Sequence, residues 1–168
     1  MHAYYDAAER NVVAVISSSS TPAPGLDTYA TASLHASPNM LDEHDIRVEL
    51  MVVAGSGTPQ AANIVATSAL CVMKDGWLAA PGVVFPNAVR EYVADTTVPH
   101  LMWTEPFDFE GLGKMTVEGI DHEVHALQGV PLSDREHDFL VTYGFDELTN
   151  RLESSNVAHF DFHRDSVC

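Results

Sequence analysis

The chain has 168 residues, 46% of them apolar, and its 24 acidic and 8 basic side chains give a formal charge of −16 at pH 7. This length suits one domain, which can bury enough surface to be stable without a metal or a disulfide. The charge disfavours nucleic acid and anionic membranes as partners, because both would be repelled. The same charge would attract a basic protein, or it serves only to keep the chain soluble.

Residues 1–26 are expected to precede the main domain as a lead segment and a linker. Residues 1–10 would form a short helical lead, and the β-branched run of residues 11–17 (NVVAVIS) predicts a strand. Ser17–Gly25 (SSSSTPAPG) is polar and interrupted by proline, which is typical of a linker or a surface loop. The folded domain would then span residues 27–168.

Strands and one helix are predicted in the first part of that domain. The clearest strand is Ile46–Val53, in which apolar residues alternate. Thr58 and Pro59 suit the start of a helix that continues to about Lys74. The other predicted strands are Thr28–Ala36, Gly82–Phe85, Val98–Thr104, Lys114–Ile120 and Glu123–Val130.

Two helices are predicted in the last third. Ser133 and Glu136 have the spacing of a capping box, and Gly144 would end the helix that they begin. A second short helix follows. The order of strands, helix, strands and helix pair predicts a single α+β domain, with a mixed or antiparallel sheet flanked by helices.

Ordered blocks of this sequence resemble the suppressor-of-fused-like domain family. The blocks are Thr31–Leu34 (TASL), Arg47–Leu50 (RVEL), Lys74–Trp77 (KDGW), Pro81–Val84 (PGVV), Pro99–Leu101 (PHL), Gln128–Glu136 (QGVPLSDRE), and the closing residues Gly144, Leu148, Leu152, Asp161, Arg164, Ser166 and Val167. The resemblance implies the stand-alone bacterial form, which occurs among immunity proteins encoded beside polymorphic toxins. It carries over no catalytic residue and no cofactor.

An aromatic and acidic segment is the candidate partner-binding site. Its residues are Trp103, Glu105, Phe107, Asp108 and Glu110. Exposed aromatic rings supply binding energy and carboxylates steer a basic partner toward them. The alternative is that the rings belong to the core and the acids to a solvated turn.

A weaker candidate is a metal site at His159, Asp161 and His163. On a strand these side chains would share one face, and imidazole and carboxylate ligands suit zinc or iron. The alternative is an exposed polar face opposite Phe160 and Phe162. The sequence otherwise contains no nucleophile elbow and no phosphate-binding lysine loop.

The charge and the motifs favour a non-enzymatic protein that binds a basic partner through an acidic surface, and the resemblance implies that this partner is a cognate toxin. A general interaction or scaffold module is the alternative, and a small metal-binding protein or enzyme is the second. The amino terminus does not have the pattern of a signal peptide, and no apolar run has the length of a membrane span. We therefore expect a cytoplasmic protein.

Overall fold

A mixed β-sheet organises the fold in the computed structural model, which describes residues 1–117, 119 and 121–168. Within these residues, eight strands join in one sheet in the order β1-β2-β3-β6-β10-β8-β7, and β9 pairs with the start of β10. Strands β6 and β10 run parallel, and the other pairs are antiparallel. The predicted α+β class is confirmed.

The strands of this sheet are β1 His2–Tyr5, β2 Val12–Ser19, β3 Leu26–Thr31, β6 Arg47–Gly55, β7 Val84–Phe85, β8 His100–Thr104, β9 Lys114–Thr116 and β10 Glu123–Leu132. A separate hairpin consists of β4 Met40–Leu41 and β5 His44–Asp45. The helices are η1 Leu34–Ala36, α1 Gln60–Asp75, α2 Asp134–Tyr143 and α3 Phe145–Ser154. Of the predicted strand Lys114–Ile120, residues 118 and 120 lie outside the described residues.

The amino-terminal segment agrees with the prediction only in part: the strand predicted at residues 11–17 is present as β2. The expected helical lead is instead strand β1, which pairs with β2. The expected linker begins inside the sheet, because Ser17–Ser19 pair with Asp27–Tyr29 of β3. Exposed serine side chains do not prevent pairing, since backbone groups make the hydrogen bonds. The same sheet therefore extends on both sides of residue 26.

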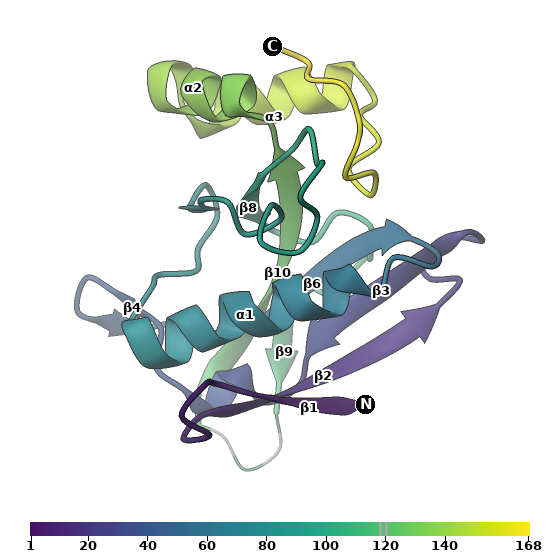
Figure 1. Ribbon diagram of the computed structural model, residues 1–168. Helices are drawn as coiled ribbons and strands as arrows, with labels where there is room; N and C mark the ends of the chain where they lie inside the picture. Colours follow the sequence, from purple (N-terminus) through teal and green to yellow (C-terminus); the bar gives the residue numbers. More distant parts are fainter. Residues whose placement is uncertain (118, 120) are drawn as a thin grey trace.

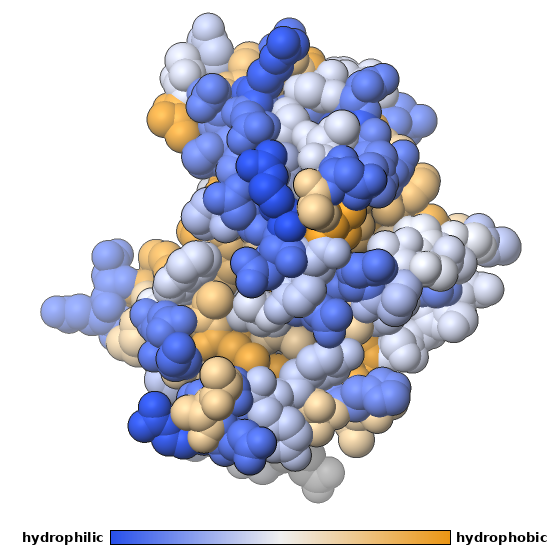
Figure 2. Space-filling view, in the orientation of Figure 1, coloured by the Kyte–Doolittle hydropathy of each residue, from blue (hydrophilic) through white to orange (hydrophobic). Residues whose placement is uncertain are grey.

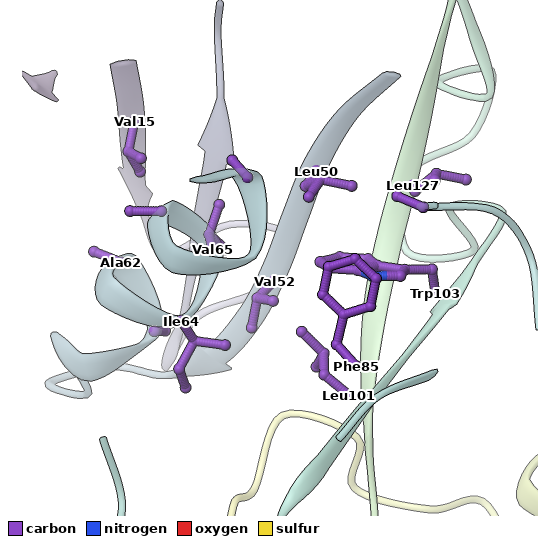
Figure 3. Close-up of a cluster of buried hydrophobic side chains, with 14 of the residues drawn as sticks. Val15, Leu50, Val52, Ala62, Ile64, Val65, Phe85, Leu101, Trp103 and Leu127 are labelled. Atoms are coloured by element: carbon purple, nitrogen blue, oxygen red, sulfur yellow. The ribbon is translucent and has the colours of Figure 1, made fainter. Parts of the chain in front are cut away.

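Helix α1 covers one face of the sheet and forms the larger core with it. Figure 3 shows side chains of α1 packed against those of β2 and β6, with Phe85, Leu101 and Trp103 at the far end of the cluster. Gly129 in β10 permits this packing, because a Cβ there would lie 2.9 Å from Leu101 Cδ1 and 3.0 Å from Val52 Cγ2. Both distances are shorter than a normal carbon contact.

Helices α2 and α3 pack on the opposite face of β8 and β10. Figure 1 shows them together at the carboxyl end of β10, far from α1. They form a second core with the sheet, made of Met102, Val130, Leu132, Leu148 and Leu152. The predicted capping box is present: Ser133 Oγ accepts the Glu136 N–H at 3.1 Å, and Glu136 Oε2 accepts the Ser133 N–H at 2.9 Å.

The carboxy-terminal tail, residues 156–168, loops away from α3 and returns to it (Figure 1). Arg164 anchors its distal part through two hydrogen bonds to Glu136, at 2.7 and 2.8 Å, and one to the Pro131 carbonyl at 2.7 Å. Glu136 also accepts the Val167 N–H at 2.9 Å. Burial alone would raise the pKa of Glu136. The hydrogen bonds to its carboxylate and the charge of Arg164 lower the pKa by more than burial raises it, so the net pKa lies below the ordinary value.

Candidate groove between loop 105–108 and helix α3

A groove of about 910 Å³ lies between the loop that follows β8 and helix α3 with the start of the tail. The first wall carries Glu105, Pro106, Phe107 and Asp108, and Figure 1 shows α3 and the yellow tail above the sheet. Helix α3 and the tail supply the other wall, with Phe145, Thr149, Glu153 and the residues from Asn156 to Phe160. The groove is larger than the pocket at the start of α1, which has a volume of about 500 Å³.

A buried glutamine holds the first wall in place. Gln128 is fully buried in the middle of β10, so its amide cannot reach water. Its Nε2 donates to Asp108 Oδ2 at 2.6 Å, and its Oε1 accepts the N–H groups of Phe107 and Asp108 at 3.3 and 3.4 Å. The loop thus provides the polar partners that a buried amide requires.

Asp108 joins the two walls. Its Oδ2 lies 2.7 Å from His159 Nε2 in the tail, and the Phe107 ring contacts the same imidazole edge-on with centroids 4.8 Å apart. Burial raises the pKa of Asp108, but the hydrogen bond and charge of His159 and the bond from Gln128 lower it more. The net pKa is below its ordinary value, so the groove holds an ionised Asp108 at neutral pH.

The charge of the groove is negative. Its described lining includes the carboxylates of Glu105, Asp108 and Glu153, and among those residues there is no lysine or arginine. Asp108 is engaged internally, whereas Glu105 and Glu153 are exposed. Figure 2 shows a largely hydrophilic surface on the face in view, with apolar surface in a few small patches.

The sequence-predicted binding residues divide between this groove and other places. Glu105, Phe107 and Asp108 line the groove, and Phe107 is 55% exposed. Glu110 is exposed but is outside the lining. The prediction of Trp103 as a surface anchor is wrong, because Trp103 is fully buried against Phe85 in the core. Alternation in a strand cannot show which face is covered by the next layer.

The three predicted metal ligands are not brought together. The tail turns at these residues instead of extending as a strand. His159 faces Asp108, whereas His163 Nε2 lies 3.3 Å from Asp95 and Asp161 accepts the His163 N–H. Within the described residues, no three metal-ligating side chains are grouped to hold an ion. Phe162 is buried as expected.

A smaller pocket of about 500 Å³ lies at the start of α1, beside Asp161 and His163. Its described lining residues differ from those of the groove, except for Phe160, which borders both.

The Asp108–His159 contact links the two walls of the groove. The hydroxyls of Thr104 and Thr149, the two in the described lining, donate to backbone carbonyls.

Sequence reasoning missed Gln128, Phe145 and Val157. For Gln128 a signal was present, because it is the one amide in the apolar run Ala126–Leu132 (ALQGVPL). A buried polar side chain in such a run requires nearby partners. Nothing in the sequence placed Phe145 and Val157 beside loop 105–108. No described helix has the length and apolarity needed to cross a membrane.

Comparisons with known proteins agree with this fold. The chain is 28% identical over 166 residues to the immunity protein YqcF of Bacillus subtilis strain 168, and the match covers 98% of this chain and 86% of that protein. The solved structure of a suppressor of fused homologue from Neisseria gonorrhoeae FA 1090 superposes with a TM-score of 0.67 at 15% identity, covering 93% of this chain and 88% of that one.

A further neighbour is the Drosophila suppressor of fused, with a TM-score of 0.63 at 14% identity, covering 94% of this chain and 43% of that protein. The Sufu–Fu complex also matches, with a TM-score of 0.64 at 13% identity over 93% of this chain and 77% of that one. These likenesses show the fold. The model of the suppressor of fused protein family matches residues 9–165, and the chain therefore belongs to that family.

Proposed function

We propose that this chain is an immunity protein that binds a cognate polymorphic toxin and blocks it without making or breaking covalent bonds. The observation that carries this proposal is the match to an immunity protein along nearly the whole of both chains. The family membership and the binding character of the groove support it. Such a protein would act in the cytoplasm of the cell that makes the toxin.

The acidic surface supplies a physical mechanism. A charge of −16 accelerates encounter with a basic toxin domain, an effect that can reach about 10–10³-fold at low salt. At the groove, the exposed Phe107 provides an aromatic anchor, and Glu105 and Asp108 supply negative potential around it. Glu110 adds an exposed carboxylate outside the lining. The bound protein would then exclude substrate from the toxin by covering its active site.

The alternative is an interaction module whose partner is not a toxin. It is favoured by the likeness to the Sufu–Fu complex, in which the structural neighbour is bound to another protein. The two functions share a binding surface but differ in the phenotype of a cell that lacks this chain. Only an immunity protein is needed for survival beside its toxin.

Co-expression with the product of the neighbouring gene tests the proposal. We expect that gene to inhibit growth alone, and this chain to restore growth and to elute with the product as one complex in size-exclusion chromatography. Persistent growth inhibition together with separate elution would contradict the immunity function. Recovery of a stable complex with a non-toxic protein would favour the interaction module.

A further inference from the structure

We propose that the groove between loop 105–108 and α3 receives a partner segment in which an arginine stands beside bulky apolar side chains. This inference rests on the proposed protein-binding function and goes beyond it by naming the occupant of one surface. Its evidence is the combination of partly exposed apolar walls, two free carboxylates and a rigid support.

The apolar walls come from both sides of the groove. Phe107 lies on the first wall, and Phe145, Val157 and Phe160 are half-buried on the second. Val130 of β10 and Leu152 of α3 also line the groove and are nearly inaccessible. A segment that enters between these walls would remove the exposed part of the rings from water, which is the main source of affinity at such contacts.

The free carboxylates specify the charge of the occupant. Glu105 and Glu153 stand on opposite walls, and within the described residues neither side chain makes a hydrogen bond or an ion pair. Asp108 is occupied by Gln128 and His159. An arginine suits this arrangement, because its stem packs on apolar surface while its planar head makes paired bonds to carboxylate.

The network of Gln128, Asp108 and His159 makes the groove ready for binding. It fixes the first wall to β10 and to the tail before a partner arrives. A preformed site loses less conformational entropy on association than a mobile loop. This network therefore acts by positioning Phe107 and Glu105 and does not itself bind the arginine.

Other occupants fit the charge less well. A second copy of this chain brings another −16 and is repelled, as is a nucleic acid. A neutral apolar ligand would use the walls but leave Glu105 and Glu153 without partners. It remains a measurable outcome of the test below.

The probe is a blocked hexapeptide that alternates leucine and arginine, with two matched peptides in which glutamine or glutamate replaces every arginine. Binding to the full chain is followed by amide chemical shifts. We expect shifts of the arginine peptide to map to residues 105–108 and 145–160, with weaker binding of the glutamine peptide and none of the glutamate peptide. Shifts that map elsewhere, or equal binding of the glutamine peptide, would overturn the inference.

Two variants sharpen the result. The double variant Glu105→Gln, Glu153→Gln should bind the arginine peptide about threefold to tenfold more weakly, since each exposed ion pair contributes little. Phe107→Ala should weaken it roughly tenfold, as loss of an aromatic anchor does. The matched control is Glu9→Gln, Glu43→Gln, which removes the same charge from exposed positions outside the groove and should leave affinity unchanged.

The rescue assay separates this inference from the proposed function. If the wild-type chain rescues growth and the groove variants rescue equally well, the partner binds elsewhere and the inference is wrong while the immunity function stands. If the wild-type chain does not rescue growth, the immunity function itself fails. Loss of rescue in the groove variants, with rescue kept in the control, supports both.

Discussion

Two carboxylates hold the carboxy-terminal tail to the body of the protein, in different surroundings. Glu136 meets Arg164 inside the molecule, where their side chains are 0% and 4% exposed. Asp108 meets His159 at the wall of the groove, where theirs are 16% and 14% exposed. We refer to these as the inner and the outer anchor.

The two anchors differ in whether polar groups beside them are free to contact a ligand. Both carboxylate oxygens of Glu136 accept hydrogen bonds within the molecule, from Arg164, Ser133 and Val167. The inner anchor therefore has no capacity for a ligand. The outer anchor adjoins an exposed Phe107 and the free Glu105, which line the groove proposed to receive a partner.

The largest effect is expected at the inner anchor. Arg164→Met leaves Glu136 buried without its charge partner, a change that typically costs about 3–5 kcal/mol. Urea denaturation would show this as a lower free energy of unfolding. The control is Arg135→Met, at an exposed arginine beside Glu136 on α2, and it should change stability by less than about 0.5 kcal/mol. Equal stability of both variants would remove the distinction between the anchors.

A smaller loss is expected at Gln128, which supports the outer anchor. Gln128→Ala removes an amide that binds Asp108 and two backbone N–H groups, and we expect a loss of about 1–3 kcal/mol. Hydrogen exchange should also become faster in residues 105–108. Gln60→Ala at an exposed position of α1 is the control. Unchanged exchange in the loop would show that Gln128 does not hold it.

The outer hydrogen bond between His159 and Asp108 should matter less for stability. His159→Gln removes a partly exposed partner of Asp108, so we expect a loss of about 0.5–1.5 kcal/mol in urea denaturation. His44→Gln in the exposed β5 hairpin serves as the comparison. A loss as large as that of Arg164→Met would mean that the outer anchor is as closed as the inner one.

The smallest difference is expected in the dependence of stability on pH. The pKa of Glu136 is lowered on folding, so its carboxylate stabilises the fold above the unfolded pKa of about 4.3. That contribution is lost as the pH falls through the lower folded pKa. The free energy of unfolding, measured by denaturation between pH 3 and 6, should fall less steeply with decreasing pH below about 4.3 in Glu136→Gln than in the wild type. Asp108→Asn should reduce this pH dependence less, because solvent screens the charge of Asp108. An identical pH dependence in Glu136→Gln and the wild type would contradict the role assigned to Glu136.

Local patterns predicted many elements correctly. The alternation around Val48 and Leu50 predicted β6, and the spacing of Ser133 and Glu136 predicted the start of α2. Both signals depend on neighbours in the sequence, which is why they could be recognised. The strand predicted at residues 11–17 is confirmed as β2, whereas the helical lead and the linker were wrong. In β1 and the serines of β2, backbone groups make the strand pairing, so the side chains give little sign of it.

The candidate site was predicted only in part. The sequence identified Glu105, Phe107 and Asp108, since acids and an aromatic ring stand together in one segment. It could not show that Asp108 faces His159, 51 residues away, or that Trp103 lies in the core.

The sequence by itself determined the acidity of the protein, the periodicity of its main strands and helices, and the blocks that resemble its family. These properties are set by composition and by residues close along the chain. The tertiary structure alone decided which acids are free for a partner and which are used internally. That choice depends on packing, because burial and hydrogen-bond partners come from segments brought together only when the sheet and the tail are folded.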